Sequence, residues 1–343
     1  MKDGTEVSAR SSAWGFLSTV HTLVDEQLRA QVQRLDEPLC GVVGYHFGWL
    51  DERGRPAVGA SGKYVRPALT LLCAEAVAGD RARAVDSAVA VELMHNFTLI
   101  HDDIIDGDRT RRHRPTVWSI FGVPIALLAG DALFSLAVTV LANSAGGQGD
   151  PVGRLARAMV DLANGQALDS AVVAGRGTSE DYLELAAKKT GALLACACAL
   201  GAAAGGGSAS QIQAIEEFGR HLGLSFQMRD DVLGIWGDSR ATGKPTGADL
   251  RTGKSLPLIA ALASGTPAGD RLARIYAEQQ TPPDDRLVEM GELVEEAGGR
   301  RLAEEMAAEH LQKALAALHS IDPEPVAAAR LSALAELIVY RDR

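Results

Sequence analysis

The sequence predicts an all-α protein, and three observations carry that prediction. Ala and Leu dominate the apolar residues while aromatic residues make up only 5%. Ala and Leu are strong helix formers, whereas aromatic and β-branched side chains favour strands. No alternating apolar–polar run bounded by hairpin turns is evident. Apolar residues also recur every four positions, on one face of a helix, at Phe16, Val20, Val24, Leu28 and Val32.

We therefore expect one domain over 1–343, a bundle of about ten or more helices around a central active-site cavity, with a flexible N-terminus over 1–15. A helix is expected to start near Arg66-Pro67, because Pro is tolerated in the first helical turn. Further helices are predicted over 82–106, 126–143, 155–174, 179 to about 200, 211–236, and around Leu302, Met306, Leu311, Leu315 and Leu318. Glycine-rich loops are predicted over 146–151, 205–210 and 240–254.

Composition narrows the class of protein. The net charge of −10, from 34 basic and 44 acidic residues, argues against a nucleic-acid partner and fits a cytoplasmic protein. The N-terminal sequence MKDGTEVSAR lacks an apolar signal core. The uncharged stretch 191–207 is rich in Ala and Gly, so we expect a tightly packed buried helix there and no transmembrane segment. The four cysteines are expected to be reduced core residues.

The first chemical signal is HDDIIDGDRTRRHR at 101–114. On a helix Asp102 and Asp106 share one face, and Asp103 lies next to it. Carboxylates at this spacing repel one another, and a hard divalent cation such as Mg²⁺ would offset the repulsion. An exposed acidic helix end is the alternative interpretation of this motif alone.

A second acidic pair favours the metal interpretation. In FQMRDDVLG, residues 226–234, Asp230 and Asp231 end another apolar helix, and Gln227 lies one turn earlier. If the two helices face each other, two carboxylate sets flank one cavity. Basic residues follow both sets: Arg111 and Arg112 after the first, Lys244 and Lys254 after the second. Metals with Arg and Lys beside them describe a diphosphate site.

Two weaker signals could bind further anionic groups. In GKYVRP, residues 62–67, Lys63 and Arg66 are three positions apart and so share a helix face. Lys189-Thr190, just before Gly191, is similar, with Lys189 as a second possible phosphate contact.

These motifs together resemble those of the trans-isoprenyl diphosphate synthases, the all-α family that includes farnesyl and geranylgeranyl diphosphate synthases. The resemblance covers roughly residues 16–340 and rests on seven motifs in order: GKYVRP, HDDIIDGDRTRRHRPTVW, AGDALF, NGQALD, KKTG, FQMRDDVLG and GKPTGADLRTGKSLP. It implies condensation of isopentenyl diphosphate with allylic diphosphates, with about three Mg²⁺ ions bound.

The resemblance also implies roles for matching positions. Asp102, Asp103, Asp106 and Asp230 would bind Mg²⁺, with Asp231 in support. The allylic diphosphate would be bound by Arg111, Lys189, Lys244 and Lys254. Thr190 and Gln227 would stabilise the allylic cation. Isopentenyl diphosphate would be bound by Lys63, Arg66, His95 and Arg112. The family's second motif is usually DDxxD, but Gly234 stands at its last position here, and Asp238 is a candidate substitute.

Product length is expected to depend on residues one to two turns before Asp102. In the family an aromatic at the Phe97 position limits the chain, and a second aromatic beside it gives the C15 product. Thr98 is small, which resembles the C20-forming type, and Met94 lies one turn deeper. We expect geranylgeranyl diphosphate, with farnesyl diphosphate and longer products as alternatives.

Three rival interpretations remain open. A terpene cyclase shares DDxxD but has no use for GKYVRP and carries a different second metal motif. A metal phosphohydrolase is suggested by His101-Asp102 but needs further His ligands and leaves the second Asp pair unexplained. A catalytically silent partner subunit would have lost an aspartate set. The resemblance further implies a homodimer, with the apolar helix over 126–142 as a candidate interface.

Overall fold

The computed structural model describes residues 2–57, 62–144, 149–171, 177–237, 247–278 and 282–340. The chain forms two compact units. Unit 1 comprises Met1–Leu155, Ala197–Gln213 and Ile321–Ala333, and unit 2 comprises Ala156–Cys196, Ala214–Ser320 and Leu334–Arg343. The single domain expected from the sequence stays a prediction, and each unit is described by itself.

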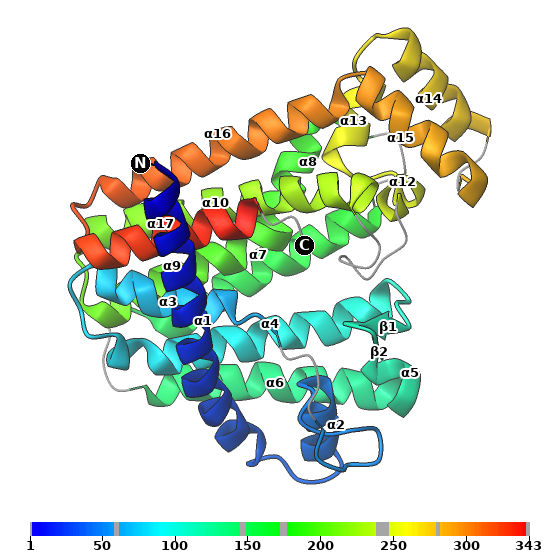
Figure 1. The fold of residues 1–343 in the computed structure, drawn as a ribbon. Coiled ribbons are helices and arrows are strands. Elements are labelled where there is room, and N and C mark those ends of the chain that lie inside the picture. The colour runs from blue at the N-terminus through cyan, green and yellow to red at the C-terminus, as the bar shows by residue number, and fades with distance from the viewer. Residues whose placement is uncertain are drawn as a thin grey trace. The chain divides into compact units, whose positions relative to one another are not determined.

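Unit 1 is built mainly from the N-terminal half of the chain (Figure 1). Its elements in chain order are α1 (Lys2–Val32), α2 (Leu39–His46), α3 (Val65–Ala76), the 3₁₀ turn η1 (Arg81–Ala84), α4 (Val85–Ile105), β1 (Thr110–Arg111), β2 (Arg114–Pro115), α5 (Val117–Phe121) and α6 (Val123–Asn143). The later part of α9 (Ala192–Gly205) and the earlier part of α17 (Pro325–Val339) complete it.

Unit 2 contains the remaining elements. They are α7 (Pro151–Ala171), α8 (Ser179–Ala186), the π-helical turn η2 (Ala187–Gly191), α10 (Ala209–Trp236), α12 (Ala248–Thr252), α13 (Leu256–Leu262), α14 (Pro267–Glu278), the 3₁₀ turn η3 (Asp284–Arg286), α15 (Leu287–Glu296) and α16 (Gly299–His319). Helices α7, α9, α10 and α17 each pass from one unit into the other.

The all-α prediction is confirmed, and the helix positions follow the sequence pattern closely. The helix expected near Arg66 begins at Val65, and the one expected over 82–106 is η1 followed by α4. Two details differ. The helix expected from 179 is interrupted by η2, and residues 110–115 form a two-stranded hairpin where we expected no strands. That hairpin is too short to show an alternating pattern, so periodicity could not find it.

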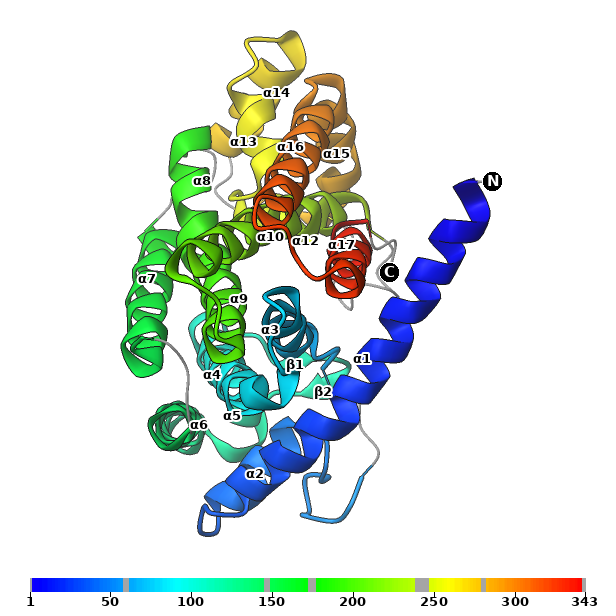
Figure 2. The ribbon, with the colours of Figure 1, turned by 90° about the vertical axis from the view of Figure 1, so that its left-hand side faces the viewer.

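The flexibility expected of the N-terminal segment over 1–15 stays a prediction. Helix α1 begins at Lys2, so the backbone of 2–15, expected to be flexible, is helical. The physical reason is propagation: Val20, Val24 and Leu28 are 0–2% exposed and anchor the helix, and adding residues to an existing helix costs little. Figure 2 shows α1 running along one side of α3 and α4, which it contacts.

The core of unit 1 is organised by α4, which packs along α6 over much of its length (Figure 1). Helix α4 is apolar on most of its surface, because α3, α6 and α1 cover it from several sides. Its buried residues include Leu93 and Met94, both fully inaccessible. The acidic motif therefore stands at the end of a helix that its neighbours hold rigidly.

Small residues bring α9 against α3 in unit 1. A Cβ added at Gly201 would lie 2.0 Å from the carbonyl oxygen of Thr70, and one at Gly205 would lie 2.7 Å from that of Ala74. Two backbones approach this closely only where no side chain intervenes. The expectation of a tightly packed buried helix over 191–207 is thus confirmed for its described core.

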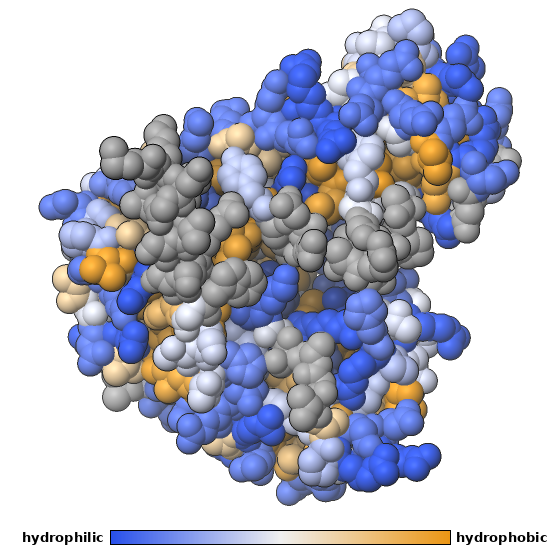
Figure 3. Space-filling model, viewed as in Figure 1, coloured by the Kyte–Doolittle hydropathy of each residue, from blue (hydrophilic) through white to orange (hydrophobic). Residues whose placement is uncertain are grey.

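Two helices are long and apolar enough to cross a membrane by length and composition alone, Val123–Asn143 and Ser179–Gly205. In the most apolar window of each helix, 44% of the residues of Val123–Asn143 and 67% of those of Ser179–Gly205 are buried within the protein. Buried core helices of soluble proteins also meet this length and composition criterion. The absence of a transmembrane segment stays a prediction. On the face drawn in Figure 3 hydrophilic residues cover most of the surface of both units.

The glycine packing generates a stability prediction. Gly201→Ala should lower the free energy of unfolding by about 1–3 kcal/mol, because the added methyl collides with the Thr70 carbonyl. Gly15→Ala is the matched control: Gly15 is also helical but has nothing within 4 Å of an added Cβ. That change should be neutral or stabilising by up to about 1 kcal/mol. Urea unfolding followed by circular dichroism measures both, and equal effects would contradict the packing argument.

Candidate active site

The first aspartate set lies at the C-terminal end of α4. Asp102 is half-buried, Asp106 is exposed, and Asp106 donates its backbone N–H to the Asp102 carbonyl at 2.8 Å, which keeps the two on one helical face. Acidic side chains at a helix C-terminus oppose the helix dipole. Such an arrangement destabilises the helix end slightly unless a cation sits beside it, as the sequence predicted.

Asp103 differs from its neighbours because the protein itself holds it. Its carboxylate is 2% exposed, and its Oδ1 accepts a hydrogen bond from Nε of Arg111 at 2.7 Å. Burial raises the pKa of Asp103 to about 6, against the opposing charge of Arg111. Asp102 and Asp106 are therefore the more accessible carboxylates for a metal, and the Asp103–Arg111 pair supports them.

A tight hairpin fixes the two arginines after α4. Arg112 and His113 form its turn with φ angles of 51° and 61°, and Arg111 pairs with Arg114 across it. Positive φ at both central residues is the geometry of a two-residue type I′ turn. Arg114 donates to the backbone carbonyls of Tyr45 and Leu50, which ties the hairpin to the segment around α2.

The set predicted to bind isopentenyl diphosphate assembles within unit 1. Nη1 of Arg66 lies 3.2 Å from Nε2 of His95. Because a guanidinium only donates, His95 Nε2 accepts, and burial followed by the Arg66 charge lowers the pKa of His95 well below its ordinary value. Burial also lowers the pKa of Arg112, while Glu92 opposes this. Lys63 is exposed at the start of the same segment.

A small cavity adjoins these residues. Its volume is about 30 Å³, enough for a bound water. It is lined by Tyr45, His46, Asp103, Arg111, Arg112, Arg114, Pro115, Thr116 and Val117. Three arginines on one small cavity make it a local concentration of positive charge.

In unit 2 the KKTG motif lies on the π-helical turn η2. Lys189 and Thr190 occupy this turn, and π-helical turns are common at functional sites. Glycines allow the neighbouring helices to reach it. A Cβ at Gly165 would lie 2.6 Å from the Lys189 nitrogen, and one at Gly223 would lie 2.7 Å from the Gly191 Cα. The turn is thus clamped between α7 and α10.

A chain of hydrogen bonds links this turn to the second aspartate pair. Thr190 Oγ1 donates to Gln227 Oε1 at 2.7 Å, and Gln227 Nε2 donates to Asp231 Oδ1 at 3.0 Å. The Leu256 backbone N–H donates to the other oxygen of Asp231 at 2.8 Å. Burial, and then the nearby Asp249 carboxylate, raise the pKa of Asp231 to about 7. Asp231 is buried, whereas Asp230 is only half-buried.

Two of the predicted lysines share one carboxylate. Lys189 Nζ donates to Asp169 Oδ2 at 2.6 Å, and Lys254 Nζ lies 3.4 Å from Oδ1 of the same residue and donates to its backbone carbonyl. Burial alone would raise the pKa of Asp169, but the two lysines bring it below its ordinary value. Asp169 was not among the predicted site residues, although it closes the NGQALD motif. Lys244 lies outside the described residues.

The departure at Gly234 has a packing explanation. A Cβ added there would lie 1.9 Å from Oδ2 of Asp249. The Asp249 carboxylate thus occupies the space that a side chain at 234 would need, and a third aspartate could not stand there without displacing it. Asp238, the substitute considered from the sequence, lies outside the described residues.

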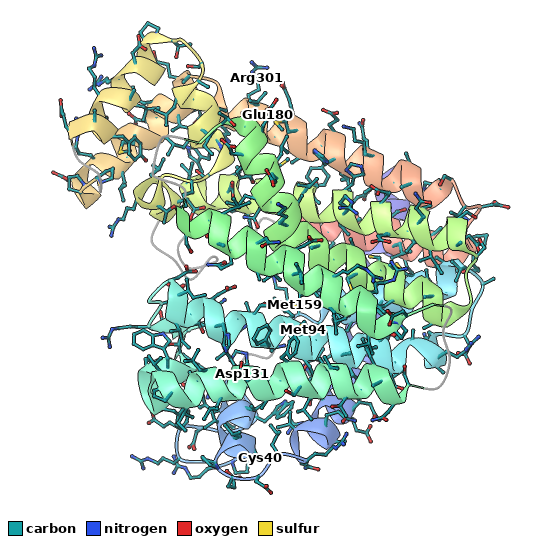
Figure 4. All side chains as sticks on the ribbon, turned by 180° about the vertical axis from the view of Figure 1, so that it is seen from behind. Cys40, Met94, Asp131, Met159, Glu180 and Arg301 are labelled. Carbon is teal, nitrogen blue, oxygen red and sulfur yellow. The ribbon has the colours of Figure 1, made fainter. Side chains whose placement is uncertain are left out.

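The predicted chain-length residues lie at different depths in unit 1. Met94 is fully buried, and Thr98 is 6% exposed with its Oγ1 donating to the His95 carbonyl at 2.8 Å. Phe97 is half-buried, with its ring centroid 5.6 Å from that of Phe134 on α6. His101 contacts α6 as well, with Nε2 3.2 Å from the Leu127 carbonyl. Figure 4 shows Met94 on α4 and Asp131 on α6.

Two aspartate sets in a helical protein, each beside basic residues paired with carboxylates, are typical of the class of enzymes that bind diphosphates through metal ions and cationic side chains. Within that class the chain belongs to the polyprenyl synthetase family, whose model matches residues 48–293. It is a prenyltransferase with trans-isoprenyl diphosphate synthase activity. The family resemblance drawn from the motifs is confirmed.

Named relatives agree with this assignment. The chain is 43% identical to the (2E,6E)-farnesyl diphosphate synthase of Mycobacterium tuberculosis over 331 residues, which covers 95% of this chain and 92% of the relative. It is also 43% identical to the geranylgeranyl diphosphate synthase of that organism over 324 residues, 92% and 90% of the two chains. A polyprenyl synthetase structure from Streptomyces coelicolor A3(2) superposes with a TM-score of 0.89 at 44% identity, covering 95% of this chain and 99% of the other.

The Thr190–Gln227 hydrogen bond generates a prediction. Thr190→Val keeps the side-chain shape but removes the hydroxyl, so kcat should fall about tenfold, the equivalent of one hydrogen bond of about 1.4 kcal/mol. Thr190→Ser restores the hydroxyl and should stay within about threefold of the original enzyme. Steady-state kinetics with both substrates, alongside the melting temperature of each variant, measures this. Equal loss in the Val and Ser variants would show that the hydroxyl is not the group that matters.

Proposed function

We propose that this prenyltransferase makes geranylgeranyl diphosphate, C20, from isopentenyl diphosphate and allylic diphosphates, with Mg²⁺ as its metal. One observation supports the metal assignment above others. In each unit one aspartate of the motif is buried and held by protein donors while its neighbour stays more accessible: Asp103 beside Asp102, and Asp231 beside Asp230. This arrangement suits one accessible carboxylate that binds the metal and a second, buried carboxylate that supports it.

The donor set fits Mg²⁺. Asp102, Asp106 and Asp230 offer only carboxylate oxygens, which hard divalent cations prefer, and basic residues stand close by for the phosphates that complete the coordination. Members of the family bind diphosphates through divalent metal. When bound, about three Mg²⁺ ions would neutralise the diphosphate and make it a better leaving group.

The remaining chemistry follows from the protein's own side chains. Arg111, Lys189 and Lys254 bind the allylic diphosphate and stabilise the negative charge that grows on it as the C–O bond breaks. The dipoles of Thr190 and Gln227 face the positive charge left on the allylic carbon. The double bond of isopentenyl diphosphate then forms the new C–C bond, and the released diphosphate accepts the proton that leaves. Lys244 is part of the proposed basic set.

The C20 product is supported by the residues before Asp102. The named relatives include both farnesyl and geranylgeranyl diphosphate synthases at equal identity, so they do not distinguish the two lengths. Phe97 supplies one aromatic ring, and the small Thr98 stands beside it where a second ring would shorten the product. A buried Met94 one turn deeper is a flexible apolar side chain that suits the end of a hydrocarbon site.

Product analysis tests this proposal. Labelled isopentenyl diphosphate is incubated with Mg²⁺ and, separately, with the C5, C10 and C15 allylic diphosphates, and the dephosphorylated alcohols are sized. We expect a C20 alcohol from each, and none when Mg²⁺ is omitted and EDTA is added. Thr98→Phe should move the product to C15, and Phe97→Ala should lengthen it. A C15 product from the unchanged enzyme would refute the length assignment. No elongation would favour a silent subunit or a cyclase.

We further propose that the enzyme is a homodimer formed through α6. Several large apolar side chains on and next to this helix are exposed: Ile120 36%, Val123 40%, Leu127 41%, Leu128 53% and Phe134 36%. Seen from behind, α6 lies uncovered toward the viewer (Figure 4). Exposed apolar side chains gathered on one helix are typical of an interface. The net charge of −10 supports a cytoplasmic location and no nucleic-acid partner as parts of the same proposal.

Light scattering at micromolar concentration tests the dimer. Leu128→Glu should give a monomer, because an isologous interface would bury the new charge twice. Val288→Glu on α15 is the control: Val288 is 74% exposed and belongs to a helix of unit 2. That variant should remain dimeric. If the unchanged protein is a monomer, the proposal is wrong.

A further inference from the structure

We infer that Glu92 is a positioning residue for isopentenyl diphosphate: its buried carboxylate holds Arg66 and Arg112 in place for the diphosphate of that substrate. This inference rests on the proposed role of the two arginines. The motifs contain no signal for Glu92, which lies ten residues before Asp102 in an apolar part of α4.

Glu92 is one of few carboxylates enclosed within unit 1. Its residue is 3% exposed, and burial raises its pKa while the charges of Arg66 and Arg112 oppose that shift. Burying an unpaired carboxylate costs free energy, so a buried carboxylate is expected only where nearby cations compensate its charge. The two largest compensating charges belong to the set proposed for isopentenyl diphosphate.

The carboxylate is fixed from one side by a chain of neutral donors. Asn96 Nδ2 donates to Glu92 Oε1 at 3.0 Å and to the Glu92 carbonyl at 2.8 Å. Because the amide nitrogen is used there, Asn96 Oδ1 must accept from His46 Nε2, 3.0 Å away. Burial, and then the charge of Arg112, lower the pKa of His46 to about 3, so His46 is the neutral tautomer with its proton on Nε2. His46 thus donates to Asn96, and Asn96 donates to Glu92.

The charges of both arginines act on the same carboxylate. A Cβ added at Gly62 would lie 3.2 Å from Nη2 of Arg112 and 3.5 Å from Oε1 of Glu92, so both groups stand beside the same backbone. Gly62 directly precedes Lys63. Arg66 donates to His95 at 3.2 Å, which leaves the neutral His95 ring with its proton on Nδ1. Cations from two segments of unit 1, Arg66 on α3 and Arg112 in the hairpin, therefore act on one carboxylate.

This geometry explains how a cationic site exists before its anion binds. Arg66, Arg112 and Arg111 repel one another, and without a counter-charge their long side chains would spread into solvent. One carboxylate among several cations reduces that repulsion and still leaves the set positive for a diphosphate. Holding the guanidinium groups in advance lowers the entropy lost on binding.

The test is a kinetic and binding comparison at pH 8. Glu92→Gln keeps the shape and can still accept from Asn96, but it removes the charge. We expect the KM for isopentenyl diphosphate to rise about tenfold or more, with kcat and the KM for the allylic substrate within about twofold. The Kd for isopentenyl diphosphate alone, measured by calorimetry without metal or allylic partner, should weaken by a similar factor. For Glu92→Asp we expect a KM and a Kd for isopentenyl diphosphate between those of the unchanged enzyme and those of Glu92→Gln.

The matched control is Glu75→Gln. Glu75 on α3 also pairs with two arginines of unit 1, Arg81 at 3.2 Å and Arg330 at 3.7 Å, but neither belongs to the site. That change should alter the melting temperature without changing either KM. If Glu92→Gln does not fold, Asn96→Ala releases the carboxylate without removing it and should raise the same KM by a smaller factor.

The outcomes separate the inference from the function on which it rests. Arg66→Lys and Arg112→Lys should each raise the KM for isopentenyl diphosphate. If they do and Glu92→Gln does not, the inference is wrong and the proposed site stands. If none of the three changes that KM, the assignment of the site itself fails. If Glu92→Gln impairs kcat, both KM values and the melting temperature together, Glu92 has only a structural role.

Discussion

In each unit, carboxylates hold the basic side chains in place. Asp103 pairs with Arg111, Asp169 pairs with Lys189 and Lys254, and the charges of Arg66 and Arg112 act on Glu92. Basic side chains gathered within one unit would otherwise repel one another and disperse. Each carboxylate costs desolvation. Charge pairing and hydrogen bonds outweigh that cost at Asp169, whose pKa is lowered, and only reduce it at Asp103 and Glu92, whose pKa values are raised. The enzyme thus keeps its cations in fixed positions while their sum stays positive.

Helix packing determines where these pairs can form. Glycine removes the side chain wherever a functional segment must approach a neighbour, as at Gly165 and Gly223 around the π-helical turn. That turn rotates Lys189 and Thr190 relative to a regular helix and lets Thr190 reach Gln227. At Gly234 the missing side chain leaves room for the Asp249 carboxylate. The space that the motif's third aspartate would take is therefore filled by Asp249.

Histidines in unit 1 contribute as neutral groups. His46 and His95 are enclosed among arginines, and burial together with that positive charge keeps both unprotonated. Each then has one donor and one acceptor nitrogen, and the partner on one side decides what the other side offers. Hydrogen bonds therefore orient these side chains: His46 donates to Asn96, Asn96 donates to Glu92, and Arg66 donates to His95.

The sequence by itself determined the fold class, the order of the helices and the two aspartate motifs with their basic neighbours, because helical periodicity and motif spacing are local properties. It could also place Asp102 and Asp106 on one face. Tertiary structure alone decided which aspartate of each pair is buried, because that depends on the segment that covers it: Arg111 for Asp103 and the start of α13 for Asp231. It likewise decided the counter-charges. Asp169 and Lys254 are 85 residues apart, and no pattern within one helix shows which distant cation a carboxylate on it will contact.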